Sequence, residues 1–250
     1  MKNVITLHNP EDTEQLGMHY LSSIKRSLFV VEDKKIGTYF EATKGIYTLD
    51  AVIPEPVSTS GSAIVKIMSD SKGTILAVMY AKAYINGKEV DNLTYIYWRV
   101  GGIWKIKFKA FPKFMEPDCN YGTFMAISRD GNILFVGADN KINDETTKAP
   151  GSKGAVYTYA YNKAKDEYSN SQLIRPVEVV SGFGSKIITD NDDYSLYKTI
   201  HISDKDGTVH KYILDYVGNK MSWRHESESK KEPPVWIQKV VGFFGSFLIM

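Results

Sequence analysis

Four glycines recur along this chain of 250 residues at almost equal intervals. Gly61, Gly122, Gly184 and Gly245 are separated by 61, 62 and 61 residues. Each is followed by a small or polar residue, an alternating apolar stretch and a polar turn, as in "SGSAIVKIMSD". A weaker and shorter copy begins at Gly17, 44 residues before Gly61. This regularity indicates an array built from one repeated structural unit.

Within each unit the apolar residues alternate with a period of two, which favours strands over helices. In the third unit "FMAIS" and "NILFVGA" flank Asp130-Gly131, a strong hairpin signal, and "GAVYTYAY" and "SQLIRPVEV" supply two more strands. Four antiparallel strands in about 60 residues predict an all-β chain of β-propeller blades. We expect one propeller unit over 1–250, with blades at about 17–60, 61–121, 122–183 and 184–244 and with 1–16 and 245–250 as parts of a further blade.

The two ends of the chain predict an incomplete blade. Residues 1–16 are typical of an outermost strand with its link into a blade, whereas 245–250 match only an innermost strand. A first and a fourth strand without the two between them cannot pair into a sheet. We therefore expect that the chain continues past Met250 or that a partner completes the ring. The alternative is a short C-terminal strand docked on an open arc.

The third unit carries a family resemblance. Its "YGTFMAISRDGNILFVGA" followed by "GAVYTYAY" resembles the FG-GAP repeat of integrin-α-like β-propellers, in its bacterial and viral form. The match is close in the third unit, weaker in the second and fourth, and poor in the first. The resemblance implies a propeller that serves as a platform for binding or assembly, and it specifies the fold better than the function.

Composition excludes some partners. The charges nearly balance, with 31 basic and 29 acidic residues, so a nucleic-acid partner is not expected. Cys119 is the only cysteine and allows no intramolecular disulfide. The first residues lack the apolar core of a secretory signal, and the apolar C-terminal stretch of about 11 residues is too short to span a bilayer. No membrane span is therefore predicted.

Metal binding has weak candidates only. Integrin-like propellers often hold calcium in the first hairpin of a blade, through an Asp-x-Asp-x-Asp-Gly loop. Only "TDNDDYS", with Asp190, Asp192 and Asp193, approaches that pattern, and it lacks the glycine, so a solvated acidic turn is the preferred interpretation. His201 and His210 flank a hairpin, but a turn centred on Asp206-Gly207 would pair His210 with Ser203, against a two-histidine site. We expect no cofactor, with calcium as the alternative.

Catalytic motifs are absent from the sequence. There is no Gly-x-Ser-x-Gly elbow, no phosphate-binding loop and no His-Glu-x-x-His, and Cys119 has no histidine at a known spacing. The expected innermost strands "AIVKIM", "FMAIS" and "SKIIT" contain no acidic residue. These observations favour a protein that is not an enzyme.

Two surface patterns remain as candidates for binding. In "IWKIKFKAF" strict alternation places Trp104, Ile106 and Phe108 on one face and Lys105, Lys107 and Lys109 on the other. The lysines suit an edge strand protected against aggregation, or a stripe that binds a glycan or a phosphate. In "VYTYAY" the residues Tyr157, Tyr159 and Tyr161 share one face, for packing between blades or for recognition of a protein or carbohydrate.

Two classes of function fit these features. The first is a non-enzymatic structural or attachment protein, foremost a component of a phage virion, that presents loops such as 139–153 to protein partners in a larger assembly or to a cell-surface glycan. Its place would be the virion or an extracellular surface, with the cytoplasm as the alternative. The second class is a glycan-active enzyme, at a microbial surface or inside the cell, that uses the channel of the propeller and needs two carboxylates about 5 to 9 Å apart.

Overall fold

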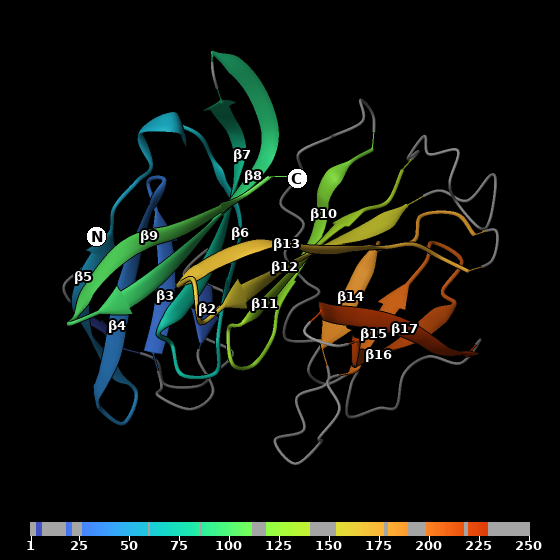
Figure 1. Cartoon of the computed structure of the whole chain (residues 1–250). Coiled ribbons are helices and arrows are strands. Elements are labelled where there is room, and N and C mark those ends of the chain that lie inside the picture. Colours follow the sequence, from blue (N-terminus) through green and yellow to red (C-terminus); the bar gives the residue numbers. More distant parts are fainter. Residues whose placement is uncertain are drawn as a thin grey trace. The chain divides into compact units, whose positions relative to one another are not determined.

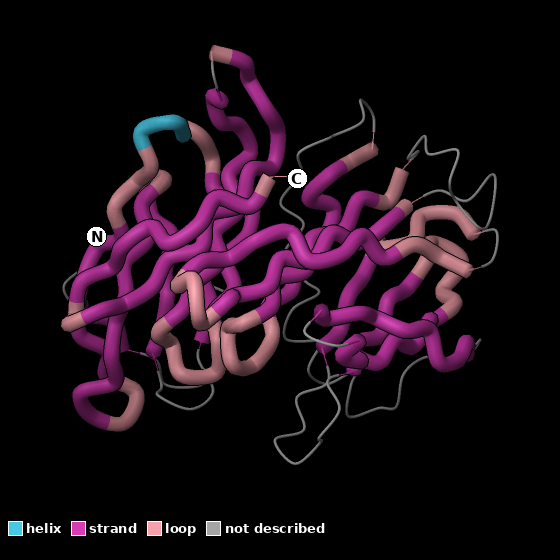
Figure 2. Tube along the Cα trace, in the orientation of Figure 1, coloured by secondary structure: helices cyan, strands magenta, loops and turns pink. Residues whose placement is uncertain are grey.

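The computed structural model describes residues 4–6, 19–21, 27–59, 61–85, 87–111, 119–140, 154–177, 180–189, 199–217 and 220–229. Over these residues most of the chain is strand, arranged in antiparallel sheets (Figure 1; Figure 2). The short 3-10 turn η2 (Val57–Thr59) is the helical element of this part of the chain. None of the described segments is a helix of the length and apolarity that a bilayer crossing requires.

Four sheets follow one another along the chain. The first has the order β1-β5-β4-β3-β2 and the second the order β6-β7-β8-β9. Their strands are β1 (Val4–Thr6), β2 (His19–Leu21), β3 (Ser27–Glu32), β4 (Lys35–Thr43), β5 (Ile46–Ile53), β6 (Ile64–Ser69), β7 (Ile75–Ile85), β8 (Lys88–Val100) and β9 (Ile103–Ala110).

The third and fourth sheets have the orders β10-β11-β12-β13 and β14-β15-β16-β17. Their strands are β10 (Tyr121–Ile127), β11 (Ile133–Ala138), β12 (Ala155–Asn162), β13 (Glu167–Ile174), β14 (Lys186–Thr189), β15 (Thr199–Ser203), β16 (Val209–Val217) and β17 (Lys220–Ser229). Strands thus neighbour one another in chain order in the last three sheets, which is the meander that the period-two pattern predicts.

The first sheet differs from the sequence prediction at its edge. Residues 1–16 are predicted to join a further blade, whereas β1 pairs with β5 of the first sheet, with Ile5 opposite Tyr47. Burial explains the pairing, because Ile5 is 6% exposed and lies in a small core with Leu28, Val30 and Tyr39. The strand that 245–250 are predicted to form lies outside the described residues.

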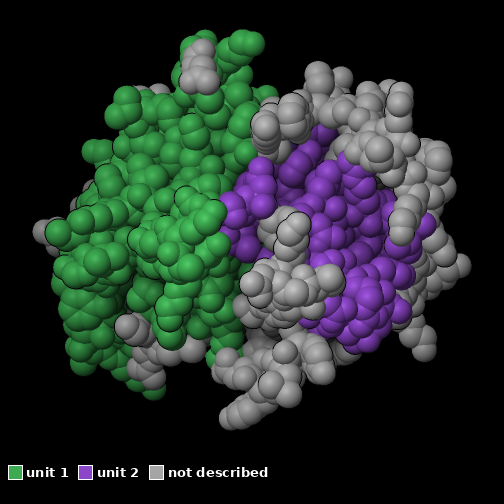
Figure 3. Space-filling model, in the orientation of Figure 1, with its two compact units in different colours: residues 1–111, 127–134, 161–168 green, residues 112–126, 135–160, 169–250 purple. Residues whose placement is uncertain are grey.

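The chain divides into two compact units, coloured green and purple in Figure 3. Unit 1 comprises residues 1–111, 127–134 and 161–168, and unit 2 comprises 112–126, 135–160 and 169–250. Unit 1 therefore holds the first two sheets and one end of the strands of the third sheet, while unit 2 holds the rest of the third sheet and the fourth.

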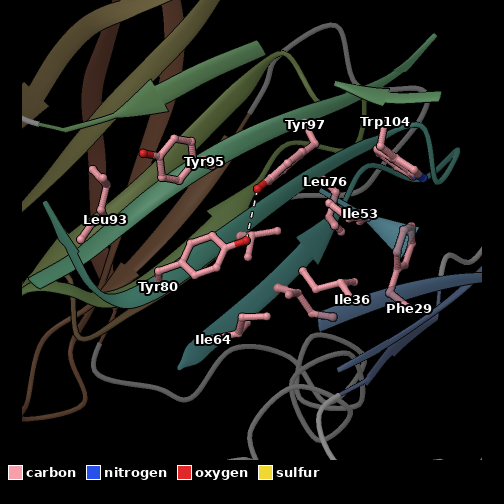
Figure 4. Packing of buried hydrophobic residues seen from close by; sticks show 13 residues of the cluster. Phe29, Ile36, Ile53, Ile64, Leu76, Tyr80, Leu93, Tyr95, Tyr97 and Trp104 are labelled. Carbon is pink, nitrogen blue, oxygen red and sulfur yellow. Dashed lines mark hydrogen bonds between the residues drawn. The ribbon is translucent and has the colours of Figure 1, made fainter. Parts of the chain in front are cut away.

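The core of unit 1 lies between the first and second sheets (Figure 4). Phe29 of β3 meets Trp104 of β9 edge to face, with ring centroids 5.9 Å apart. The hydroxyls of Tyr80 and Tyr97 lie 3.2 Å apart, and Tyr97 Oη donates to the carbonyl oxygen of Pro54 at 3.1 Å. Burial raises the pKa of Tyr80 to about 12, so its hydroxyl stays neutral and serves the core as a hydrogen-bonding group. Other members of this core are Ile36, Ile53, Ile64, Ile67, Leu76, Val78 and Leu93.

Strand order is matched across this interface in unit 1. The strand β2 lies beside β6, and β5 lies beside β9. β2 and β6 each begin a run of four consecutive strands, and β5 and β9 each end one. The first strands of the two runs are thus neighbours, and so are the last strands. Such stacking is the arrangement of adjacent blades in a propeller.

Carboxylates hold the turns between the first two strands of the second and third sheets. Asp70, which is 2% exposed, accepts hydrogen bonds from the backbone nitrogens of Thr74 at 2.7 Å and Ile75 at 2.8 Å. At the corresponding turn of the third sheet, the exposed Asp130 accepts a hydrogen bond from Ser128 Oγ at 2.6 Å. Where the chain turns, the backbone lacks the hydrogen bonds that paired strands make with each other, and these side chains supply hydrogen bonds in their place.

The core of unit 2 depends on backbones that approach closely. A Cβ atom added to Gly137 of β11 would lie 2.1 Å from the carbonyl oxygen of Gly184, which precedes β14. A second link joins Gln172 of β13 to Trp223 of β17, whose backbone nitrogen donates to Gln172 Oε1 at 2.6 Å. The third and fourth sheets therefore pack through small residues at one point and through a shared hydrogen bond at another.

The hairpin between β15 and β16 corrects the predicted register by one residue. His210 lies opposite Ile202 rather than Ser203, and His201 lies opposite Lys211. The turn is longer than predicted because Asp204 accepts hydrogen bonds from the backbone nitrogens of Asp206 at 3.0 Å and Thr208 at 2.9 Å. His201 and His210 are therefore not cross-strand partners.

Candidate functional site at the bulge of strand β9

A β-bulge interrupts the alternation of β9. Phe108 lies opposite Ile96 and Ile106 lies opposite Tyr97, so Lys107 is an extra residue without a cross-strand partner in the register. The bulge turns Phe108 away from the face of Trp104: Phe108 stacks on Tyr168 with centroids 5.7 Å apart, whereas Trp104 packs on Phe29. The prediction that Phe108 shares a face with Trp104 and Ile106 is therefore wrong, because strict alternation does not survive an inserted residue.

The bulge brings one basic residue into an aromatic cluster of unit 1, here called the β9 bulge cluster. Trp98 of β8 lies 4.6 Å from Tyr161 of β12 between ring centroids, and 6.2 Å from Tyr168 of β13. Lys107 Nζ lies 5.1 Å from the centre of the Trp98 ring and 5.9 Å from that of Tyr161. The cluster consists of Trp98, Lys107, Phe108, Tyr161, Asp166 and Tyr168.

Charge in the cluster is centred on Asp166, in the turn between β12 and β13. Lys107 Nζ lies 2.6 Å from Asp166 Oδ2, and Tyr161 Oη donates to Asp166 Oδ1. The hydrogen bond from Lys107 lowers the pKa of Asp166, so the carboxyl group is ionised at neutral pH. The same carboxylate raises the pKa of Tyr161, whose phenol stays protonated. The cluster thus presents an ammonium donor, a phenol and a carboxylate acceptor side by side.

Tyr168 forms the buried base of the cluster. It is 2% exposed, and its Oη donates to the carbonyl oxygen of Gly131 at 2.6 Å while accepting a hydrogen bond from Trp98 Nε1 at 3.2 Å. Burial raises the pKa of Tyr168 above its usual value, so the phenol remains neutral. These two bonds fix the orientation of the Trp98 ring, which is partly exposed like Lys107 and Tyr161. The side chain of Asp166 is 71% exposed.

This arrangement suits a ligand with an apolar face and a polar rim. The indole and phenol rings offer flat apolar area, while Lys107 donates and Asp166 accepts hydrogen bonds beside it. Over the described part of the chain no three His, Cys, Asp or Glu side chains gather as a metal ion would need. The rings, the ammonium and the carboxylate are the kinds of group that line organic-ligand sites.

The predicted tyrosine face divides between packing and the cluster. Tyr159 is 0% exposed and its hydroxyl lies 2.9 Å from that of Tyr121, so it belongs to the core of unit 2. Tyr157 meets the Tyr121 ring edge to face at 5.3 Å. Tyr161 alone of the three predicted tyrosines lies in the β9 bulge cluster.

The predicted lysine stripe also divides. Lys105 and Lys109 are exposed, while Lys107 is partly buried beneath its contacts with Trp98 and Asp166. The candidate calcium residues Asp190, Asp192 and Asp193 lie outside the described residues, so calcium there stays a prediction.

Sequence reasoning missed Trp98, Asp166 and Tyr168. Asp166 lies in the hairpin turn "NKAKDEY", where an acidic residue is ordinary, and it adopts a positive φ of 53°. A tryptophan within a strand is usually highly buried. The useful signal was the pair of tyrosines on either side of that turn, Tyr161 and Tyr168, because hairpin partners approach one another in space.

Comparison with solved structures identifies the class of fold. A protein from Lactobacillus plantarum superposes with a TM-score of 0.52 at 14% sequence identity, over 93% of this chain and 60% of that chain. The periplasmic gluconolactonase of Pseudomonas aeruginosa superposes with a TM-score of 0.50 at 12% identity, over 87% of this chain and 54% of that chain. This chain thus spans less than two thirds of the length of either protein.

Together with the antiparallel sheets, this likeness confirms the fold class that the repeats predict. The chain is an all-β propeller of antiparallel sheets, of which the first has five strands and the other three have four in the described part of the chain. No protein-family profile matches the chain, and no curated protein is similar to it in sequence. The resemblance to the FG-GAP repeat therefore stays a prediction, as do the blade boundaries.

The comparisons correct the expected function. The sequence favours a structural or attachment protein of a phage virion, and that interpretation is wrong: one of the similar structures is a gluconolactonase, an enzyme by its name, and neither is described as a virion component. The error arose because a repeat motif reports on the packing of blades and carries no information about the ligand at their surface.

Proposed function

We propose that this chain is a carbohydrate-active protein that binds a saccharide or a sugar-derived lactone at the β9 bulge cluster. The observation that carries the proposal is the inserted residue in β9, which places Lys107 beside Trp98, Tyr161 and Asp166. Support comes also from the gluconolactonase of the same fold, whose name denotes a sugar lactone as its substrate.

Sugars match the cluster in two respects. The C–H groups on one face of a pyranose ring form an apolar surface that packs on an aromatic ring such as Trp98. The hydroxyls at the rim of the sugar both donate and accept hydrogen bonds, so Asp166 and Lys107 would each find a partner. A ligand hydroxyl would replace part of the existing contact between Lys107 and Asp166, which is 2.6 Å long and lies at the surface.

The cluster is suited to binding rather than to cleavage of glycosidic bonds. Glycoside hydrolysis by the usual route needs two carboxylates about 5 to 9 Å apart. Among the residues that make up the β9 bulge cluster, Asp166 supplies the one carboxylate. If the protein hydrolyses a sugar lactone, which needs no such pair, the cluster holds the sugar while the ester reacts elsewhere.

Calorimetric titration with glucose, galactose, cellobiose and glucono-δ-lactone tests this proposal. The unmodified protein should bind at least one of them, and Trp98→Ala and Asp166→Asn should each weaken that binding about tenfold or more, equivalent to about 1.4 kcal/mol. Lys82→Ala is the matched control, since Lys82 forms an exposed pair with Glu89 at 2.6 Å elsewhere in unit 1.

Asp166→Asn keeps the proposal open to refutation if Trp98→Ala unfolds, because Asp166 is largely exposed and its replacement is nearly isosteric. Absence of binding to all four sugars would refute the proposal. Binding that Asp166→Asn and Trp98→Ala leave unchanged would place the sugar elsewhere on the protein and refute the assignment to the cluster.

A further inference from the structure

An ammonium group lies within the β9 bulge cluster. Lys107 Nζ lies 5.1 Å from the centre of the Trp98 ring and 5.9 Å from that of Tyr161, and a cation so close to an aromatic ring is attracted by its electrons. The same nitrogen lies 2.6 Å from Asp166 Oδ2. Two aromatic rings and a carboxylate, here called the ammonium site, thus meet around one positive charge.

The groups of the ammonium site are held by hydrogen bonds that do not involve Lys107. Trp98 Nε1 donates to Tyr168 Oη at 3.2 Å, and Tyr168 Oη in turn donates to the carbonyl oxygen of Gly131 at 2.6 Å. Tyr161 Oη donates to Asp166 Oδ1, so the second ring and the carboxylate hold each other. The site is therefore organised in advance for another cation that takes the place of the lysine.

Lys107 can leave the site at low cost. Its ammonium is a compact charge at the end of a flexible four-carbon stem. The side chain of Asp166, which it contacts, is 71% exposed. Ion pairs at a surface contribute little to stability, because water and dissolved ions compete for both charges. An external ammonium group can therefore exchange with that of Lys107.

The surroundings favour a positive ligand over a negative one. Burial is the main cause of the raised pKa of Tyr168, and the carboxylates of Asp130 and Asp70 add to it through their charge. The base of the cluster thus lies in a negative potential. Lys107 balances the charge of Asp166, so when its ammonium leaves, the site keeps a negative charge that a cation neutralises.

We propose that the saccharide bound at the β9 bulge cluster is an amino sugar, whose ammonium group displaces that of Lys107 and pairs with Asp166. This assignment rests on the saccharide binding proposed above and adds the charge of the sugar. The apolar face of the sugar packs on Trp98, while its ammonium lies beside the two rings and the carboxylate. Lys107 is then an internal competitor: the apparent Kd of the sugar equals the intrinsic Kd divided by the fraction of molecules in which the site is vacant.

Calorimetric titration at pH 6 with glucosamine, N-acetylglucosamine and glucose tests this assignment. At this pH the amine of the sugar carries a proton and the carboxyl group of Asp166 is ionised. Glucosamine should bind the unmodified protein about threefold more tightly than N-acetylglucosamine, in which a neutral amide replaces the ammonium. Lys107→Met removes the competing charge and should bind glucosamine about tenfold more tightly than the unmodified protein does. Its affinity for glucose should be unchanged or lower, because a hydrogen-bond donor is lost.

Two further variants serve as controls. Lys82→Met removes an ion pair of the same length, between Lys82 and Glu89, from another part of unit 1, and should leave all three affinities unchanged. Lys107→Met combined with Asp166→Asn should lose the gain for glucosamine, since the vacated site then lacks its carboxylate.

The outcomes separate the charge of the sugar from the binding of sugars in general. Glucosamine that binds more weakly than glucose or N-acetylglucosamine would overturn the amino-sugar assignment and leave saccharide binding intact. Glucosamine that binds Lys107→Met no more tightly than the unmodified protein would do the same. So would an equal gain for glucose in Lys107→Met, because Lys107 would then obstruct sugars of any charge. Absence of binding to all three sugars would overturn both proposals. If Lys107→Met does not fold, the order of affinities in the unmodified protein decides.

Discussion

At the scale of single residues, glycine serves two purposes in this chain. It lets two backbones approach closely at Gly137, and it lets the backbone adopt a positive φ at Gly61. Gly137 would bring a Cβ atom to within 2.1 Å of a backbone oxygen of Gly184, and its φ lies outside the left-handed region. Gly61 has a φ of +74° but open space around it. Gly137 is therefore required by close packing alone, and Gly61 by backbone conformation alone.

We predict that Gly137→Ala destabilises the protein more than Gly61→Ala. The first should cost about 2 to 4 kcal/mol, since two backbones must separate, and the second about 1 kcal/mol. Equilibrium unfolding in urea measures both. Gly184→Val combines the two effects, with a φ of +89° and a Cβ atom 2.8 Å from the oxygen of Ala155, so it should be the least stable. Equal stabilities for Gly137→Ala and Gly61→Ala would contradict the assignment.

The buried and the exposed turn carboxylates should differ in their contribution to stability. Asp70→Ala removes an acceptor from two backbone nitrogens and from Thr74 Oγ1 at 3.0 Å, and leaves those donors in a buried turn. We expect a loss of about 2 to 4 kcal/mol. Asp130→Ala acts at an exposed turn and should cost about 1 kcal/mol or less. Chemical denaturation measures both variants, and similar losses in the two would show that burial of the carboxylate is unimportant.

Lys66 makes stability depend on pH in a defined direction. The folded state holds its proton less tightly than the unfolded state, so burial of the ammonium destabilises the fold below pH 8 and the penalty disappears as pH rises to about 10.5. A shift of this size corresponds to about 3 kcal/mol. We predict that Lys66→Met is more stable than the unmodified protein at pH 7 and that the difference shrinks between pH 8 and pH 10.5. A difference that stays constant with pH would show that the ammonium carries no burial penalty.

At the scale of strands, the alternation of apolar residues predicted most of the strands, but it predicted none of the bulges. The strands β10 and β11 lie on either side of Asp130-Gly131 as the pattern predicts, although β11 is buried at every position. The bulges in β6 and β9 each add one residue, at Val65 and Lys107, and nothing in their composition marks the insertion. The candidate site follows from one of these insertions, which explains why only Lys107 and Tyr161 of its members were predicted.

Deletion of Lys107 tests the importance of the bulge. Removing the residue would restore alternation, turn Phe108 away from Tyr168 and break the contacts of β9 with the third sheet's end in unit 1. We expect a loss of about 2 to 4 kcal/mol, whereas Lys107→Ala, which keeps the inserted backbone unit, should cost less than about 1 kcal/mol. Urea denaturation compares them. If the deletion were as mild as the substitution, β9 would tolerate either register and the bulge would not position the cluster.

At the scale of the whole molecule, the interval between the repeated glycines was sufficient to predict the architecture. A unit of about 60 residues with four short alternating strands has few ways to bury its faces other than stacking as blades. The edge pairing of β1 was not accessible in the same way, because three residues carry too little pattern to specify a partner. Function was not accessible either, since the residues of the cluster come from four strands and a turn, which the sequence alone does not bring together.

Ligand binding should appear as a change in the stability of the whole protein. A sugar that binds only the folded state at a concentration of 100 times its Kd stabilises that state by about 2.7 kcal/mol, which raises the Tm of a chain of this size by about 5 to 10 °C. The sugar found by calorimetry should produce this shift in the unmodified protein and in Lys82→Ala, measured by circular dichroism. Asp166→Asn should show a smaller shift or none, because its weakened affinity leaves less ligand bound at the same concentration. Equal shifts in Asp166→Asn and the unmodified protein would mean that the carboxylate beside Lys107 does not take part in recognition.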